Sequence, residues 1–253
     1  MHTDALEILG CRLDLVDSDD AAAQILTLTQ ERAAAQIVTL GTEMVVYAQR
    51  DERFRSIVNG SALSLCDTVG LLAVARRRGA ALRDRVTGID LIGRLCAQAA
   101  KDGLRVYFLG GAPGVAADTA AILEALYPGL AIAGARDGYF AESESSGIVE
   151  EIARSRADLL FAGMGFPRQE FWLAEHLRET GCGAGIGVGG SFDVISGRVE
   201  RAPQIFRRLG VEWLYRLIRE PQRWRRQLAL PQFVWLIALD RLGIAAKKGT
   251  VRS

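Results

Sequence analysis

The sequence predicts an α/β fold in which a mostly parallel sheet carries helices on both faces. Short apolar runs alternate with longer amphipathic stretches, as strands and crossover helices do in such a sheet. Some runs are apolar almost without interruption, which is typical of parallel strands buried on both faces. With 253 residues, 49% of them hydrophobic and 24% charged, the chain is long enough for one large domain with or without an appendage.

The apolar runs and the amphipathic stretches give the expected elements in order. Strands are predicted at 36–40, 62–66, 104–109, 130–134, 157–162 and 184–188. Helices are predicted at 19–33, 42–58, 68–78, 88–102, 114–127, 143–155, 169–179 and 191–196. Parallel strands bring their carboxyl ends to one edge of the sheet, where ligand crevices form, so the residues that follow each strand are the candidate site.

Charge is divided unevenly between an acidic body and a basic tail. Residues 1–200 carry 19 basic and 27 acidic side chains, whereas residues 201–253 carry 12 basic and 3 acidic ones. We therefore expect a body at 1–200 and a helical appendage at 201–253 that meets an anionic partner.

The appendage also contains three of the four tryptophans, Trp213, Trp224 and Trp235, among many arginines. Aromatic and leucine faces beside arginine are typical of a helix that lies in a membrane interface. Nucleic acid is a less suitable partner because the acidic body would repel it. The alternative is an ordinary helix that docks its apolar face on the body.

Cysteine and histidine usage excludes several kinds of site. The four cysteines have no metal-ligand spacing and favour a reducing cytoplasm. The amino terminus lacks a signal-peptide pattern, and no apolar run approaches the roughly 20 residues of a membrane-spanning helix. His2 and His176 are the only histidines, which argues against histidine-based catalysis or metal binding. The Asp17-Ser18-Asp19 sequence resembles a metal-binding Asp-x-Asp pattern, but helix capping is favoured there.

Asp67 follows the apolar run 62–66 directly. A carboxylate at the carboxyl end of a buried strand lies where ligands bind, so Asp67 is a candidate catalytic residue. Asp is also a preferred N-cap residue, and a helix beginning near Thr68 would make Asp67 a cap. These residues alone leave both interpretations open.

Two further strand ends carry candidate binding residues. Thr39 and Thr42 lie on either side of the turn at Gly41, where their hydroxyls either face the crevice or cap the next helix. Gly110 and Gly111 follow the run 104–109. Glycines at that place allow a phosphate to approach the backbone near a helix amino terminus, or they serve only a tight turn.

Arg85 and the three residues 168–170 complete the candidates. An arginine just before a helix opposes the helix dipole, so Arg85 either binds an anion such as phosphate or forms a surface ion pair. Arg168, Gln169 and Glu170 begin a helix after the glycine-rich turn 163–167. Their side chains could orient sugar hydroxyls and phosphate, and Glu170 could instead cap the first helical turn.

Taken together, the motifs resemble the WecG/TagA/CpsF glycosyltransferases, known as glycosyltransferase family 26, over nearly the whole chain. The residues that carry the resemblance are 38–40, 43–46, Asp67, 85–91, 108–111, 138–140, 163–170, Gly197, 201–203, 212–217 and 220–221.

The resemblance implies a bacterial hexosyltransferase of cell-surface polysaccharide synthesis with a Rossmann-like body. Such an enzyme is inverting, needs no metal or other cofactor, and moves N-acetylmannosamine or a related sugar from a UDP-sugar donor onto an undecaprenyl-diphosphate-linked sugar. Its appendage closes the site near the inner face of the plasma membrane, so the resemblance implies a cytoplasmic, peripheral protein that meets an anionic membrane surface. The oligomeric state is left open, a homo-oligomer included.

The resemblance also assigns roles residue by residue. Asp67 is the general base, and Arg85 handles phosphate. Thr39 and Gln169 contact the donor or the acceptor. Gly41, Gly110, Gly111 and Glu170 are further candidate substrate-binding residues. The appendage arginines Arg216, Arg223 and Arg226 meet a diphosphate.

Two positions depart from the family pattern. Gly41 stands where an Asn is usual, and Thr68 follows Asp67 where a Gly is usual. The two departures leave the identity of the donor sugar open, so UDP-glucose or a UDP-uronic acid is an alternative donor. The alternative from another class is a non-catalytic protein that binds a nucleotide or a lipid carrier. A Rossmann oxidoreductase is disfavoured because the complete dinucleotide fingerprint is absent.

Overall fold

Six parallel strands form the central sheet of the protein, in the order β4-β3-β8-β7-β5-β6. The structure is a computed structural model that describes residues 4–200, 203, 206, 215 and 228–242. The strands are β3 (Ala35–Leu40), β4 (Leu63–Cys66), β5 (Arg105–Gly110), β6 (Ala131–Arg136), β7 (Leu159–Gly163) and β8 (Ala184–Gly187). All six predicted strands are confirmed, each to within two residues at either end.

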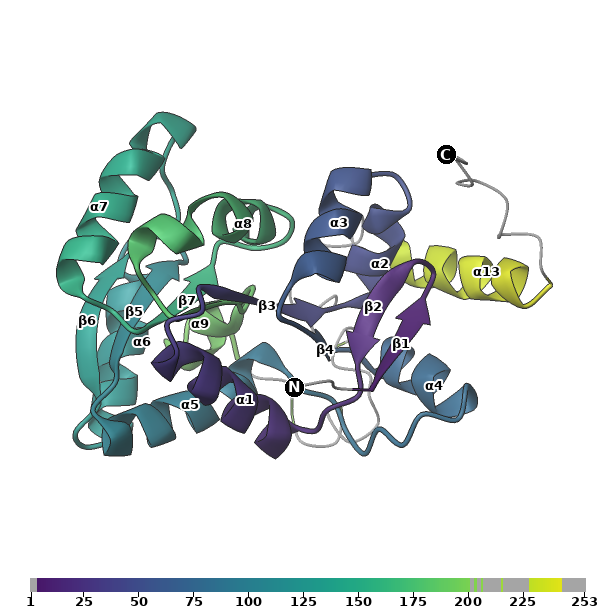
Figure 1. The fold of residues 1–253 in the computed structure, drawn as a ribbon, viewed down its shortest axis with the longest axis horizontal. Helices are drawn as coiled ribbons and strands as arrows, with labels where there is room; N and C mark the ends of the chain where they lie inside the picture. Colours follow the sequence, from purple (N-terminus) through teal and green to yellow (C-terminus); the bar gives the residue numbers. More distant parts are fainter. Residues whose placement is uncertain (1–3, 201–202, 204–205, 207–214, 216–227, 243–253) are drawn as a thin grey trace.

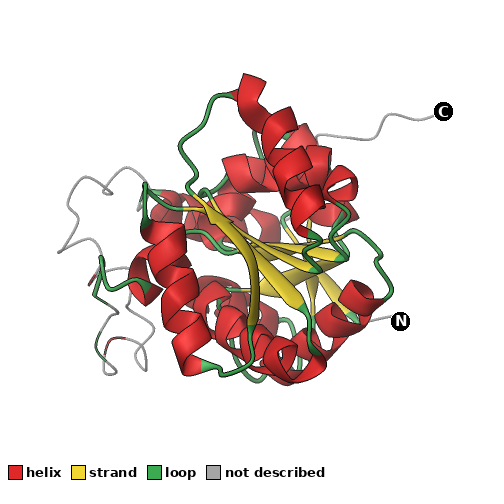
Figure 2. Ribbon diagram, turned by 90° about the vertical axis from the view of Figure 1, so that its left-hand side faces the viewer, coloured by secondary structure: helices red, strands yellow, loops and turns green. Residues whose placement is uncertain are grey.

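Helices cover both faces of this sheet (Figure 1; Figure 2). They are α1 (Ser18–Gln30), α2 (Thr42–Ala48), α3 (Glu52–Gly60), α4 (Val69–Arg77), α5 (Gly88–Asp102), α6 (Val115–Leu126), the 3-10 helix η1 (Glu142–Glu144), α7 (Ser145–Ser155), α8 (Arg168–Thr180), α9 (Ser191–Ile195) and α13 (Ala229–Arg241). The layered arrangement confirms the predicted Rossmann-like class.

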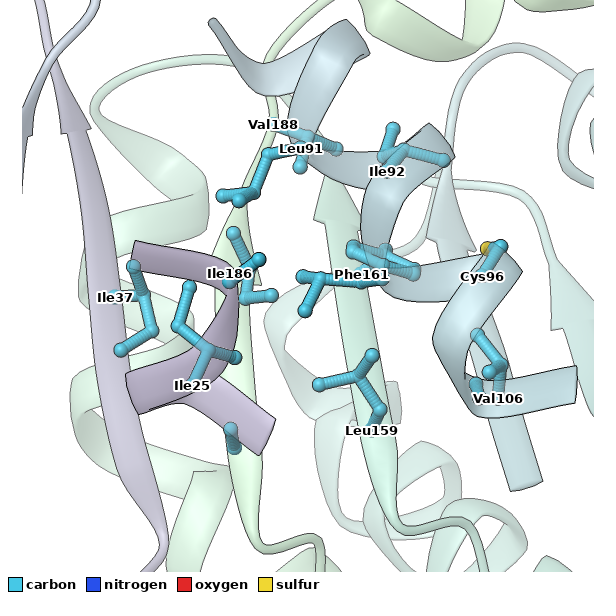
Figure 3. Packing of buried hydrophobic residues seen from close by; sticks show 14 of the residues in the cluster. Ile25, Ile37, Leu91, Ile92, Cys96, Val106, Leu159, Phe161, Ile186 and Val188 are labelled. Atoms are coloured by element: carbon cyan, nitrogen blue, oxygen red, sulfur yellow. The ribbon is translucent and has the colours of Figure 1, made fainter. Parts of the chain in front are cut away.

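Side chains alternate between two cores along each strand. On β3, Ile37 faces the core built with α1, α5 and α6, where Phe161 and Ile186 also lie (Figure 3). Val38, the next residue, faces the opposite core with α2, α3 and α4. On β7, Leu160 packs in the same way toward α7 and α8. Because both faces are covered, the strands read as continuous apolar runs, which is why the sequence revealed them.

The prediction of a single helix at 42–58 is wrong, because the chain forms two helices there, α2 and α3. Asp51 lies between them and caps α3, since its carboxylate accepts a hydrogen bond from the Phe54 N–H at 2.9 Å. The same carboxylate accepts from the Tyr47 hydroxyl at 3.0 Å. At α1, the Asp17 carboxylate accepts from the N–H groups of Asp19 and Asp20 at 3.0 and 3.1 Å, which confirms capping there.

An antiparallel hairpin of β1 (Ala5–Ile8) and β2 (Cys11–Asp14) was not predicted. Its turn residues Leu9 and Gly10 both have positive φ, 51° and 78°, as a tight hairpin turn requires. Each strand has only four residues, and Leu9 is an unusual residue for that backbone conformation, so the sequence signal was weak.

A buried carboxylate joins this hairpin to the edge strand β4. The side chain of Asp14 is 5% exposed, and it accepts from the Ser64 N–H at 2.7 Å and from the Arg12 guanidinium at 3.0 Å. Arg12 also donates to the Ser61 carbonyl at 2.6 Å. The network satisfies polar groups at the sheet edge that would otherwise be buried without partners.

Replacing Asp14 with Ala is expected to lower the free energy of unfolding by about 2–3 kcal/mol, because it leaves the buried Ser64 N–H without its acceptor and removes the charged partner of Arg12. Urea unfolding at constant m-value measures the change. The control is Glu7→Ala, an exposed carboxylate on the same hairpin, which is expected to change stability by less than about 0.5 kcal/mol. A similar loss in both variants would contradict the role given to Asp14.

Helix α13 packs on α2 and brings part of the predicted appendage against the body. Phe233 and Ile237 are buried at this contact. Arg78 forms an ion pair with Asp240 at 2.5 Å, and Arg50 donates to Gln232 at 2.9 Å. The division of the chain at residue 200 stays a prediction. Within the described part of the chain, no helix is long and apolar enough to cross a membrane.

Candidate active site

A cavity of about 1010 Å³ opens at the carboxyl edge of the sheet. Every strand of the sheet contributes to its wall through the residues at or just beyond its end. From β3 to β8 in chain order, each strand provides one of the following wall residues: Thr39, Asp67, Gly111, Gly138, Gly163 and Val188. Ala229 and Leu230 at the start of α13 complete one side. The site therefore lies where a parallel sheet is expected to bind its ligand.

Asp67 lies in this wall immediately after β4. Its N–H donates to the Leu40 carbonyl at 3.1 Å, which aligns it with the end of β3. The N-cap of α4 is Thr68, one residue later, so the interpretation of Asp67 as the cap is wrong. The carboxylate occupies the cavity wall.

Arg85 is held beside Asp67 by the backbone. The Val86 N–H donates to the Cys66 carbonyl at 2.7 Å, so the segment 85–86 runs alongside the end of β4. Both charged side chains line the cavity. Burial, followed by the negative charge of Asp67, raises the pKa of the Cys66 thiol to about 12, and the Arg85 charge opposes this rise. Cys66 therefore remains a neutral thiol beside the Asp67 carboxylate and the Arg85 guanidinium.

Thr39 and Gln169 also line the cavity, and their polar atoms form hydrogen bonds within the protein. The Thr39 hydroxyl donates to the Gly187 carbonyl at 2.7 Å. The Gln169 side-chain oxygen accepts from the N–H groups of Gly165 and Gly189 at 3.2 and 3.0 Å. The two residues thus tie together the segments that follow β3, β7 and β8, and the substrate contacts expected of them stay a prediction.

Glu170 and Gly110, which were expected to contact the substrate, are not among the residues that line the cavity. Glu170 is fully buried on the side of α8 that faces β8, and burial raises the pKa of its carboxyl to about 7. Gly110 has φ +146°, and a Cβ there would lie 2.4 Å from the Gly163 carbonyl carbon. The glycine is needed because β5 and β7 approach closely at this point.

Gly41 and Gly111 do line the cavity, for different reasons. Gly111 has φ +71°, and a Cβ would lie 2.7 Å from Val115, so the turn requires glycine. Gly41 has φ −106°, which any residue adopts, and a Cβ would meet only the Thr68 methyl at 3.5 Å and the Met44 sulfur at 4.0 Å. The two positions that depart from the family pattern therefore face each other across the ends of β3 and β4.

Tyr139 belongs to the segment 138–140 that carries the family resemblance, but no role in the site was predicted for it; it lines the cavity with 77% of its surface exposed. Arg168 holds this loop by donating to the carbonyls of Gly138 and Phe140 at 2.6 and 2.7 Å, with its guanidinium 4.3 Å from the Phe140 ring. The Tyr139 N–H donates to Asp137 at 2.9 Å. An aromatic residue just beyond a predicted strand was the signal. Other lining residues missed are Glu43, Asp90 and Asp193.

The remaining predicted site residues, Arg216, Arg223 and Arg226, lie outside the described residues. Among the described side chains, Glu142, Glu175 and His176 bring three candidate metal-ligand atoms within 4.8 Å of one another. None of these three lines the cavity, and Glu175 is paired with Arg53. The group is therefore separate from the cavity that Asp67 lines.

A doubly wound parallel sheet with glycine turns, a carboxylate and a guanidinium at its carboxyl edge defines a class, the Rossmann-like proteins that handle phosphorylated ligands. Within that class, the chain belongs to the glycosyl transferase WecG/TagA/CpsF family, whose model matches residues 6–247. It is therefore a glycosyltransferase, as the sequence motifs predicted.

Two relatives share the name N-acetylglucosaminyldiphosphoundecaprenol N-acetyl-beta-D-mannosaminyltransferase. The protein from Bacillus spizizenii strain W23 is 35% identical over 226 residues, which cover 88% of this chain and 87% of the relative. The protein from Bacillus subtilis strain 168 is 32% identical over 203 residues, which cover 80% of this chain and 78% of the relative.

Proposed function

We propose that this protein transfers N-acetylmannosamine from a UDP donor to N-acetylglucosamine linked to undecaprenyl diphosphate, with inversion and without a metal. The observation that supports this most directly is the placement of Asp67 and Arg85 side by side in one cavity, through the backbone contact between Val86 and Cys66. The names of the two relatives support the donor sugar and the acceptor.

The proposed reaction needs a base and a group that stabilises the leaving diphosphate. The Asp67 carboxylate takes the proton from the acceptor hydroxyl as that oxygen attacks the anomeric carbon of the donor. The bond between the anomeric carbon and the UDP oxygen breaks, and UDP departs with the electron pair. Arg85 meets the growing negative charge through hydrogen bonds from its guanidinium.

Glycine turns in the same wall suit the diphosphate. Gly111, Gly163, Gly165 and Gly189 all line the cavity, where the absence of side chains allows a diphosphate to approach the backbone closely. The N–H groups of Gly165 and Gly189 donate to Gln169, and the Gly111 N–H donates to the Gly163 carbonyl at 3.0 Å, so these turns provide space for the diphosphate while Arg85 provides hydrogen bonds to it.

A donor screen with one lipid-diphosphate acceptor tests the proposal through the UDP that is released. We expect the full chain to turn over UDP-N-acetylmannosamine faster than UDP-glucose or a UDP-uronic acid. Preference for another donor would overturn the donor assignment alone. Binding of UDP without release from any donor would instead support the non-catalytic alternative.

We also propose that α13 attaches the protein to the inner face of the plasma membrane. Phe233 and Ile237 pack on the body, whereas Val234, Trp235 and Leu242 are 67%, 66% and 70% exposed. The same helix begins at Ala229, in the cavity wall. An apolar helix face on a basic segment is suited to an anionic lipid surface, and binding there would place the cavity near a lipid-linked acceptor.

The double variant Val234→Ser with Trp235→Ser is expected to weaken binding to anionic liposomes at least roughly tenfold, because it removes apolar surface that would insert. Liposome sedimentation measures the change. Leu126→Ser is the matched control, since Leu126 is 61% exposed but lies on α6. Equal loss in the control, or undiminished binding in the double variant, would contradict the proposal.

A further inference from the structure

Gln169 joins two loops of the cavity wall through one oxygen atom. Its side-chain oxygen accepts from Gly165, in the turn after β7, and from Gly189, in the turn after β8. An amide group can do this in only one orientation, because its other end is an NH₂ donor that would oppose two N–H groups. The geometry of the wall therefore depends on what fixes the Gln169 amide.

Glu170 fixes this orientation. The Gln169 Nε2 donates to the Glu170 Oε1 at 2.7 Å, which leaves the amide oxygen facing the two glycines. The pair is packed tightly against β8, since a Cβ on Gly187 would lie 2.7 Å from the Gln169 Nε2 and 3.0 Å from the Glu170 Oε1. The backbone carbonyl of Glu170 accepts from Gln36 on β3 at 3.0 Å.

Burying a carboxyl group at position 170 is unfavourable for the free energy of folding. The Glu170 residue is 0% exposed, and among the described residues its Oε2 has no hydrogen-bond partner. An apolar side chain would fill the same space without that cost. The carboxyl is therefore explained by the one thing an apolar side chain cannot do here, which is to accept the hydrogen bond from Gln169.

We infer that Glu170 is a positioning residue that acts through Gln169: it sets the spacing of the two glycine loops across the cavity and does not touch the substrate. The inference deepens the proposed function and rests on it only for the identity of the ligand. The loops bind the donor in both the ground state and the transition state, so loosening them is expected to raise the KM for the donor more than it lowers kcat.

Amide hydrogen exchange of the ligand-free protein tests the inference without any assay of activity. In Glu170→Met, the exchange of the Gly165 and Gly189 amides is expected to accelerate about tenfold, as loss of one net hydrogen bond allows. Glu170→Gln keeps an oxygen that can accept from Gln169, so its exchange rates and its KM for the donor are expected to stay close to those of the wild type.

Tyr107→Phe is the control for general destabilisation. It removes a buried hydroxyl that donates to Glu151, away from the cavity wall, so the two glycine amides are expected to keep their exchange rates. If Glu170→Met does not fold, Gln169→Met is the second variant, and the same acceleration is expected.

Two results would overturn the inference. One is unchanged exchange of the Gly165 and Gly189 amides in Glu170→Met or Gln169→Met. The other is a loss of turnover in Glu170→Gln as large as in Glu170→Met, which would mean that the charge of Glu170 acts on the substrate. Failure of the proposed function would appear differently, as altered loop exchange with no turnover of UDP-sugars by the wild type.

Discussion

Asp67→Asn is expected to lower kcat by about 10³-fold, because it removes the only group that the proposed mechanism uses to take the proton from the acceptor hydroxyl. Asn has nearly the same shape, so the backbone bond from residue 67 to Leu40 and the packing at the end of β4 are expected to persist. UDP affinity, measured by calorimetry, is expected to change by less than about threefold, since the base contacts the acceptor side of the reaction.

The control for Asp67→Asn is Asp102→Asn. Asp102 is an exposed carboxylate at the carboxyl end of α5, just before β5 begins, and thus at the opposite edge of the sheet. Its replacement is expected to leave UDP release unchanged. Near-normal turnover by Asp67→Asn in the same assay would rule out its role as the base.

Arg85→Ala is expected to lower kcat/KM by roughly 10²- to 10³-fold, because a charge that stabilises the leaving diphosphate acts most strongly in the transition state. Arg85→Lys is expected to recover part of this loss. Lysine keeps the positive charge but cannot make the paired hydrogen bonds of a guanidinium. Steady-state UDP release, together with the affinity for the product UDP, separates the effects on chemistry and on binding.

Arg83→Ala is a matched control for Arg85→Ala, because Arg83 is an exposed arginine two residues earlier that does not line the cavity. It is expected to retain wild-type kcat/KM. Equal losses in both variants would indicate a general effect of positive charge on this segment, and an unchanged kcat/KM in Arg85→Ala would exclude the leaving-group role.

The fold could be predicted because each sheet strand appears in the sequence as a short apolar run, and such runs recur along the chain. Ile37 and Val38 each face a packed core, so β3 reads as an unbroken apolar run, and the other sheet strands follow the same logic. The hairpin was missed because Leu9 adopts a left-handed backbone conformation in its turn. Leucine is not a typical turn residue, so the sequence gives no turn signal there. The break between α2 and α3 depends on the cap at Asp51, inside a pattern that otherwise continues as a helix.

The candidate site was predictable to the level of strand ends and no further. Asp67 was identified because it follows an apolar run, and Arg85 because an arginine before a helix opposes the helix dipole. The structure places both beside the end of β4. Whether Gln169 or Glu170 faces the cavity depends on the rotation of α8 against β8, which residue order alone does not determine. Tyr139 depends on a loop held by Arg168, a contact between segments about thirty residues apart.

The contact between Gly41 and Thr68 changes how two sequence differences should be understood. Counted along the chain, they are separate events 27 positions apart, one losing a side chain and one gaining it. In space, the Cβ direction of residue 41 leads to the Thr68 methyl at 3.5 Å, so the two positions share one small volume at the ends of neighbouring strands. A side chain introduced at residue 41 would contact Thr68, so the size of the residue at either position limits what the other can be.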